Sequence, residues 1–418
     1  MSTSLMQRNW ARAAQFFVFA ALPLHALLTW QVPYTTTFIR HYSVTVLAIE
    51  LAVIVIALLA GRSLFGTFQQ LRPITRIAAL AIIGIAGVTT LLVAPDRYGA
   101  SIHLIITIIH CLFAVAAADM LASFTRSERR DLAIALALGL TVYGVISYAL
   151  ALSVRNDPDF NWWRFGAGVT HVRHIGYYGV ALTGLAGGLL VSAPDSRRMA
   201  LFMLPLTMGF ALTAWSGART SFIAAIGITL LLIALAPRAG RLRASQLCLL
   251  SFAIALPVSA LFIPAPFWGI WRILNTSLAQ GGDLNSYSTG RLTIWRETLK
   301  LIAERPLLGH GEGQFRQLIT VERGLINHPH NALLQVLFQW GVIGTLAVVV
   351  LALNPLRNLR NAIRKEAESA FPAIGLLGGL GAVSVVDDPL FYPFPLVMAI
   401  IALIILASPV RTPEATSG

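Results

Sequence analysis

The sequence predicts an all-α protein that crosses a membrane about twelve times. Of its 418 residues, 56% are hydrophobic and only 12% are charged, and the mean hydropathy is +0.73. Soluble domains carry about 25% charged residues. A chain of this length with so few charges cannot form one water-soluble core, so most of its surface is expected to face membrane lipids.

A helix needs roughly 20 mostly apolar residues to span a bilayer. The predicted spans are 13–30, 43–60, 76–94, 100–124, 132–153, 175–193, 199–215, 220–236, 245–264, 331–353, 370–386 and 393–408. The first apolar run follows Arg8 and Arg12 without a small-residue cleavage site, which indicates a retained span and not a removed signal peptide.

The loop charges predict an orientation. Twelve spans place both termini on one side, and most loop arginines fall on that side. By the positive-inside rule this side is cytoplasmic. The other side carries fewer cations, among them Arg164, Arg173, Arg219 and several in a long loop at 265–329. Cations kept on the disfavoured side suggest a negatively charged substrate there.

Two features of the composition argue against other classes of protein. The net charge of +13 is spread between apolar runs and forms no continuous basic face, so no nucleic-acid partner is expected. The two cysteines, Cys111 and Cys248, lie in separate apolar runs and have neither a metal-binding spacing nor an obvious disulfide partner.

The long external loop is predicted to contain amphipathic helices. An amphipathic stretch near 267–274 precedes a helix at 289–304, which Pro306 stops. After a glycine-rich turn, Pro329 leads directly into the span at 331–353. Because proline favours helix starts, His330 and Asn331 are expected at the external N-terminus of that span.

Arg219 and Arg291 are also expected at helix N-termini, at the starts of the span at 220–236 and of the loop helix. Such ends offer free N–H groups and a partial positive charge, which suits an anion. The same field disfavours imidazolium, so a neutral His330 would suit a general base. Spacing alone leaves open that His330 only caps its helix and that each arginine snorkels to headgroup phosphates.

A metal site and a transporter are the alternatives. Asp157 and Asp159 form an acidic pair, as do Asp387 and Asp388, and such carboxylates can hold Mg²⁺ or Mn²⁺. However, Asp-Pro-Asp is also a common turn, so we expect no metal and no other cofactor, and we expect Asp388 to orient an arginine or a histidine. Transporters keep their charges near the midplane, whereas here they lie at the external edge.

Three motifs resemble the O-antigen ligase family, which shares a domain with O-antigen polymerases and bacterial protein O-oligosaccharyltransferases. The family's pattern of His-Asn, nine residues, glycine, two residues and glycine is matched by His330-Asn331, Gly341 and Gly344. Further matches are Gly290-Arg291 with Trp295, the block Pro306–Gly311, and the turn Ser216–Arg219. The matching core covers about 205–350, and it predicts a core domain at 205–353 that includes the loop 265–329, flanked by N-terminal spans within 1–204 and by C-terminal spans and a cytoplasmic tail within 354–418.

The resemblance implies a GT-C-like fold and inverting, metal-independent transfer of a glycan from undecaprenyl diphosphate. The enzyme would lie in the bacterial inner membrane, with cytoplasmic termini and a periplasmic active site. In the ligase branch, the acceptor is lipid A–core and the product is lipopolysaccharide. The alternative acceptors are another lipid-linked glycan, for a polymerase, or a protein. Without a large C-terminal soluble domain, the chain is expected to be a ligase.

The resemblance also implies roles for individual residues. Arg219 and Arg291 would bind the diphosphate, and His330 would take the acceptor proton. The further candidates for substrate binding are Arg164, Arg173, His174, His328, Asn331 and Asp388. Which of His310, His328 and His330 lies nearest the diphosphate stays open. Glu312, in the glycine-rich turn, is expected to cap that turn or to face water.

Overall fold

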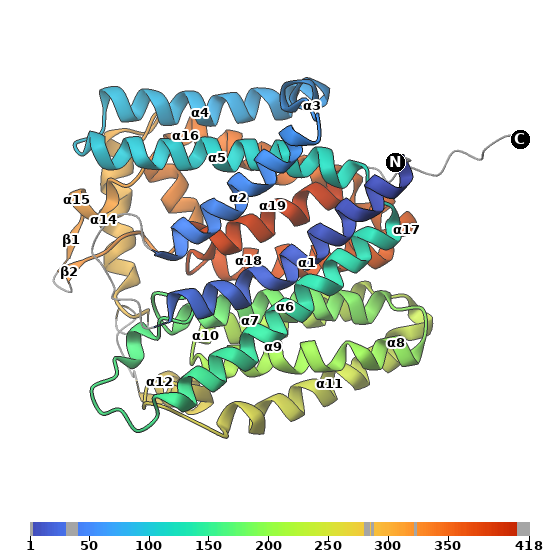
Figure 1. Ribbon diagram of the computed structural model, residues 1–418. Coiled ribbons are helices and arrows are strands. Elements are labelled where there is room, and N and C mark those ends of the chain that lie inside the picture. The colour runs from blue at the N-terminus through green and yellow to red at the C-terminus, as the bar shows by residue number, and fades with distance from the viewer. Residues whose placement is uncertain (1–2, 31–40, 280–284, 286–287, 322–323, 408–418) are drawn as a thin grey trace, which may run out of the picture.

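The computed structural model describes residues 3–30, 41–279, 285, 288–321 and 324–407, which form a bundle of long helices (Figure 1). The long helices are α1 (Thr3–Thr29), α2 (His41–Leu59), α4 (Pro73–Leu92), α5 (Arg97–Ala122), α6 (Arg126–Ser153), α7 (Arg173–Ser192), α9 (Met203–Trp215), α10 (Arg219–Leu235), α11 (Arg238–Ala260), α16 (Ala332–Leu353), α18 (Ala367–Ser384) and α19 (Pro393–Ala407).

Shorter elements join the long helices at the two ends of the bundle. They are α3 (Leu64–Gln70), η1 (Trp162–Arg164), α8 (Ser196–Leu201), α12 (Gly269–Ala279), α14 (Arg291–Glu304), α15 (Phe315–Leu318), η2 (Pro355–Asn358), α17 (Leu359–Lys365) and η3 (Pro389–Phe391). The strands β1 (Thr320–Val321) and β2 (Gly324–Leu325) pair antiparallel.

The predicted fold class is confirmed. Within the described residues, nine helical stretches are long and apolar enough to cross a membrane, and α2 with α3 forms a further candidate bent by 96°. Two shorter apolar helices, α10 and α19, complete the set. A helix corresponds to each of the twelve predicted spans. The chain is therefore a polytopic all-α membrane protein, whereas the GT-C-like relationship and the three-part division of the chain remain predictions.

The two ends of the bundle differ in what they carry. The start of α1 and the end of α19 lie at one end with α3, α8 and α17, and we call this the terminal end (Figure 1). The opposite end carries α12, α14, α15 and both strands, and we call it the loop end (Figure 1). The long predicted loop at 265–329 thus caps one end of the bundle, and α12 and α14 are the helices that we expected within it.

Helix α7 is the centre of the bundle and packs against α9, α10 and α18. Nearly all of its residues are buried. Glycines allow this packing: a Cβ on Gly184 would overlap the carbonyl of Gly375 in α18, and a Cβ on Gly188 would overlap that of Phe371. Small residues commonly let membrane helices approach this closely. The N-terminus of α7, with Arg173, is thereby held at the middle of the loop end.

Helix α16 is broken at Gly341, whose φ is +59°. A break frees backbone groups inside the bundle, where water cannot satisfy them, so other partners must do so. The turn at 306–311 supplies these partners. Its hydrogen bonds to α16 are His310 N–H to Phe338 O (2.8 Å), Gly311 N–H to Gln339 O (3.0 Å), Val342 N–H to Pro306 O (2.8 Å) and Ile343 N–H to Leu307 O (3.4 Å).

The hydrogen bonds between the turn at 306–311 and α16 give a physical reason for two of the sequence motifs. The turn Pro306–Gly311 fills the break that Gly341 creates, and the backbones approach so closely that neither Gly309 nor Gly341 has room for a Cβ. Both glycines also have positive φ angles, which other residues rarely adopt. The two motifs therefore contact each other through their backbones, and this backbone contact attaches the loop end to α16.

We expect Gly341→Ala to destabilise the protein by roughly 2–4 kcal/mol, because a Cβ there adds a left-handed strain and a backbone overlap. The measurement is thermal unfolding in detergent. Gly227→Ala in α10 is the matched control, since a Cβ there meets nothing within 4 Å. Equal unfolding midpoints for Gly341→Ala and Gly227→Ala would contradict the close backbone contact at Gly341.

Candidate functional site

At the loop end, Asp387 contacts two of the three predicted catalytic residues at once. Its Oδ1 lies 2.9 Å from Nδ1 of His330, and its Oδ2 accepts a hydrogen bond from Arg291 at 3.1 Å. The Asp387 and Arg291 side chains are 7% and 14% exposed, whereas His330 is 32% exposed. The structure thus joins His330 and Arg291 through one buried carboxylate and leaves the imidazole accessible.

The start of α16 is docked onto the end of α18, which brings His330 to Asp387. The Asn331 side chain accepts a hydrogen bond from Leu334 N–H (2.9 Å) as the N-cap of α16. Its amide also donates to the carbonyl of Val385 (2.7 Å), just after α18. Both ends of the Asn331 amide are engaged in this way, and His330 directly precedes this N-cap, so both residues lie at the N-terminus of α16, as predicted.

The loop before α16 holds His330 in an unusual conformation. Its φ is +56°, a left-handed value that is uncommon for a residue other than glycine. The backbone N–H of His330 donates to Nδ1 of His328 at 3.3 Å, and Trp295 donates to the carbonyl of Pro329 at 2.9 Å. Strained residues of this kind occur where the surroundings hold a side chain in one position.

The charges around Asp387 determine its ionisation. Burial alone would raise the pKa of Asp387, but the hydrogen bond to His330 and the positive charge of Arg291 hold it well below its ordinary value. An ionised carboxylate can only accept hydrogen bonds, so Nδ1 of His330 must carry a proton. In a neutral imidazole, Nε2 then has the lone pair that can accept another proton.

The neighbouring Asp388 behaves differently from Asp387. Its Oδ1 accepts a hydrogen bond from Phe391 N–H (3.1 Å), and its Oδ2 is buried with no hydrogen-bond partner among the described residues. Burial and the charge of Asp387 raise the pKa of Asp388 to about 8. The contact with an arginine and a histidine that we expected of Asp388 is therefore made by Asp387.

Arg219 begins α10 after a tight turn that packing holds in place. In this turn Gly217 has a positive φ of 63°, and Ala218 N–H donates to Oγ of Ser216 at 3.3 Å. Gly176 of α7 lies against the same turn, since a Cβ there would come within 2.9 Å of the Ser216 hydroxyl. This close approach brings the start of α7, and with it Arg173, beside the start of α10.

Four arginines from different elements share this region: Arg173 of α7, Arg219 of α10, Arg272 of α12 and Arg291 of α14. Charge interactions link Arg173 to Arg219, Arg291 and Asp387, and link Arg272 to Arg173 and Arg219. Burial and the nearby positive charges of Arg173 and Arg272 lower the pKa of His171 to about 3, against the opposing charge of Asp387. The region is strongly cationic, and an anion with several charges would fit it.

The other predicted histidines pack against aromatic residues or a backbone carbonyl. His174 packs on Tyr392, with ring centroids 4.1 Å apart, and Tyr177 beside it hydrogen-bonds to Asp387. His328 is buried, with Nε2 3.3 Å from the hydroxyl of Tyr392. His310 lies with Nε2 2.7 Å from the Leu301 carbonyl, within the turn that fills the break in α16.

The expectation for Glu312 is wrong, because this side chain is buried and neither faces water nor belongs to the site. It accepts hydrogen bonds from Thr107 of α5 (2.9 Å) and from Trp340 of α16 (3.1 Å). Burial raises the pKa of Glu312 to about 7, although these hydrogen bonds and the charge of His110 act in the opposite direction. The glycine-rich turn lets Glu312 reach between the two helices.

The remaining sequence candidates lie apart from the contacts of Asp387. Arg164 is exposed at the end of η1. Asp157 accepts a hydrogen bond from Asp159 N–H at 3.0 Å, which is the turn that Asp-Pro-Asp commonly forms. Within the described ranges, no group of three or more His, Cys, Asp or Glu side chains could hold a metal ion.

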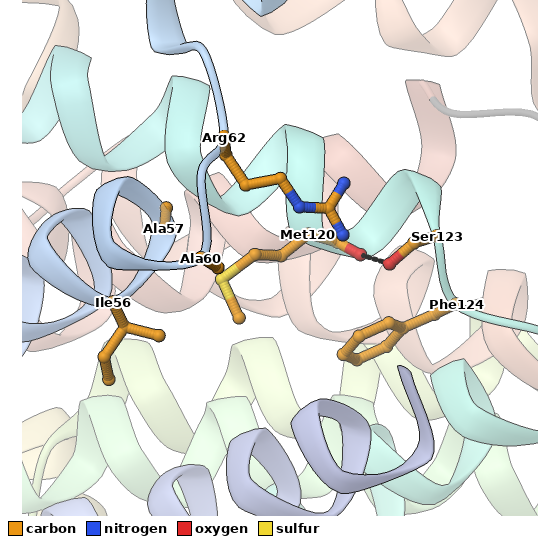
Figure 2. A pocket seen from close by; sticks show the side chains of 7 residues that line it. All are labelled: Ile56, Ala57, Ala60, Arg62, Met120, Ser123 and Phe124. Carbon is orange, nitrogen blue, oxygen red and sulfur yellow. Dashed lines mark hydrogen bonds between the residues drawn. The ribbon is translucent and has the colours of Figure 1, made fainter. Parts of the chain in front are cut away.

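A small cavity lies at the terminal end, between α2 and α5, and is unrelated to the cationic region (Figure 2). Its volume is about 10 Å³, room for a single water molecule and far too small for a glycan. Its lining is mostly apolar: Ile56, Ala57, Ala60, Arg62, Met120, Ser123 and Phe124.

Sequence reasoning missed Asp387 as the joining residue, and it missed Arg272 and Tyr177. Asp387 belongs to an acidic pair in which we considered Asp387 only for metal binding and expected Asp388 to orient an arginine or a histidine. Arg272 lies in a stretch that showed only an amphipathic pattern. Tyr177 is one of many aromatic residues in apolar runs, so no sequence signal singles it out.

The fold and this site define a polytopic membrane protein with a histidine and arginines gathered at one end of the bundle. Residues 200–349 match the model of a family described as O-antigen ligase. An O-antigen ligase of Pseudomonas aeruginosa is 34% identical over 93 residues, which are 22% of this chain and 23% of that protein. The resemblance to the O-antigen ligase family is thereby confirmed over this region, which contains Arg219, Arg272, Arg291 and His330.

We expect Asp387→Asn to lower stability at pH 7 by about 1.5–3 kcal/mol, the usual contribution of a hydrogen bond to a charged group. Asp388→Asn should leave stability nearly unchanged at pH 7, because a carboxyl with a pKa of about 8 is mostly protonated there and asparagine is also neutral. The midpoint of thermal unfolding in detergent measures both. A larger loss for Asp388→Asn than for Asp387→Asn would contradict the assigned charges.

Proposed function

We propose that this protein is an O-antigen ligase that transfers a glycan from undecaprenyl diphosphate to lipid A–core. The observation that carries the proposal is the pairing of His330 and Arg291 on Asp387 beside Arg173 and Arg219, largely within the region that matches the family. The reaction would take place at the periplasmic face of the inner membrane, with both termini in the cytoplasm.

The arginines suit the leaving group of this reaction. As the bond between the anomeric carbon and the diphosphate breaks, negative charge builds up on the diphosphate oxygens. Arg219 and Arg291, with Arg173 beside them, would stabilise that charge through paired N–H donors, in the role that Mg²⁺ has in many phosphate sites. Stabilisation of developing charge by one preorganised donor is typically worth about 3–4 kcal/mol. The proposed reaction therefore needs no metal ion and no other cofactor.

His330 suits the attacking side of the reaction. The acceptor hydroxyl would form its bond to the anomeric carbon while its proton passes to Nε2 of His330. Asp387, bound to Nδ1, would stabilise the imidazolium that results, as a carboxylate does behind a catalytic histidine. The 32% exposure of the His330 side chain leaves room for the acceptor to approach.

The carboxylates near the site favour inversion by a single displacement. Retention would require a carboxylate nucleophile close to the anomeric carbon. Both oxygens of Asp387 are held by His330 and Arg291, and Glu312 is buried against Thr107 and Trp340. Neither side chain is placed to form a covalent intermediate.

We predict that Arg219→Ala, Arg291→Ala and His330→Ala each slow transfer at least about 100-fold while the protein still folds. The measurement is transfer by purified protein from a synthetic undecaprenyl-diphosphate glycan to lipid A–core, in EDTA. Arg296→Ala, which removes an exposed cation of α14, is the control and should keep the wild-type rate.

Full activity of well-folded Arg219→Ala would contradict the role of the arginines. An EDTA block that Mg²⁺ relieves would instead favour Asp157 and Asp159. Transfer by the detergent-purified protein, without a membrane potential, would argue against a transporter.

The identity of the acceptor is tested separately, because polymerases and protein glycosyltransferases of this family would use the same chemistry. We predict that disruption of the gene leaves long O-antigen on the lipid carrier and none on lipid A–core, seen on lipopolysaccharide gels. A core that carries a single unit would indicate a polymerase, and unchanged lipopolysaccharide with an unglycosylated protein would indicate a protein glycosyltransferase.

A further inference from the structure

Helix α12 is amphipathic and turns one arginine toward the bundle. Trp271 and Leu274 are 64% and 46% exposed, while Trp268 just before the helix and Ile273 within it are buried. Arg272 lies between these outward and inward residues and is only partly exposed. An arginine at a lipid interface usually extends to headgroups or water. The direction of Arg272 toward the bundle therefore needs a different explanation.

The guanidinium of Arg272 lies against the turn that carries Arg219. Its Nη1 donates a hydrogen bond to the carbonyl of Gly217, two residues before Arg219. Its Cδ would lie 3.1 Å from a Cβ on Gly217, so the absence of a side chain there makes room for the arginine. The contact brings the charge of Arg272 beside that of Arg219.

Among the described residues that these charge interactions join, four are arginines (Arg173, Arg219, Arg272 and Arg291) and one is an aspartate, Asp387. Burial and the charges of Arg173 and Arg219 lower the pKa of Arg272 to about 10, so it remains charged at neutral pH. Asp387 is ionised, and it is already shared by His330 and Arg291. Like charges held together in a partly buried region repel one another. A multivalent anion that binds among them removes this cost.

We propose that Arg272 is a further ligand of the diphosphate, which it binds together with Arg219. The inference rests on the proposed function for the identity of the donor, but the anion site itself can be tested without any glycan. Because α12 also bears the exposed Trp271 and Leu274, this assignment places one diphosphate ligand on a helix with an outward apolar face.

The test separates the charge of Arg272 from its hydrogen bond to Gly217. Arg272→Lys keeps the charge, whereas Arg272→Gln keeps an N–H donor and loses the charge. Binding of inorganic pyrophosphate to the purified full-length protein is measured by calorimetry. We expect Arg272→Gln to weaken binding about tenfold or more, the usual effect of losing a hydrogen bond to a charged group, and Arg272→Lys to weaken it much less. Arg296→Gln is the matched control.

The same variants are then compared in the transfer assay. Arg272→Gln should raise the KM for the lipid-linked donor and the inhibition constant of pyrophosphate together. Unchanged pyrophosphate affinity in Arg272→Gln, or equal losses in both variants, would overturn the assignment and leave Arg272 as a support for the turn. Wild-type protein that binds pyrophosphate through Arg272 but transfers no glycan would contradict the proposed function alone.

Discussion

The site depends on one buried carboxylate. Asp387 accepts a hydrogen bond from Arg291 on one oxygen and lies within hydrogen-bonding distance of His330 on the other. These two residues come from α14 and from the start of α16, which are separate elements of the loop end. Asp387 also determines the tautomer of His330, because an ionised carboxylate requires a proton on Nδ1. Without it, Arg291 and His330 would lose the carboxylate that they share.

Two contacts fix the positions of the loop-end elements relative to Asp387. Asn331 binds the carbonyl of Val385 and so fixes the start of α16 to the end of α18. Farther along α16, the break at Gly341 receives the turn at 306–311, which follows α14 directly. The part of the chain that follows α14 is thereby held at the turn 306–311 and again at Asn331. A cationic site at a membrane surface needs this rigidity, since four like charges would otherwise move apart.

The sequence predicted the spans and part of the site, for physical reasons. A spanning helix is a local pattern of about 20 apolar residues, so each of the twelve predicted spans corresponds to a helix. His330, Arg219 and Arg291 could be singled out because helix starts are also local features and because few cations lie on that side of the predicted topology. The family motifs added the expectation that these three act together, and the catalytic roles themselves remain predictions.

What the sequence did not predict depends on contacts between distant segments. Asp387 lies 57 residues from His330, and only the packing of α16 on α18 brings them together. Arg272 faces the bundle because Gly217 leaves room for it, which no local pattern reveals. Glu312 was expected to face water, since a glycine-rich turn usually lies at a surface. It is buried because the break in α16 draws that turn into the bundle.

The proposed mechanism depends on Asp387 as the residue that orients His330, and the transfer rate of Asp387→Asn tests this role most directly. Asparagine keeps the size of the side chain but has no charge, so it stabilises an imidazolium poorly and can hold the wrong tautomer. In an assay with a synthetic undecaprenyl-diphosphate glycan and lipid A–core, a folded Asp387→Asn protein should be slower than wild type by at least about 100-fold. A folded Asp387→Asn protein that transfers glycan at the wild-type rate would contradict the role of Asp387 in orienting His330.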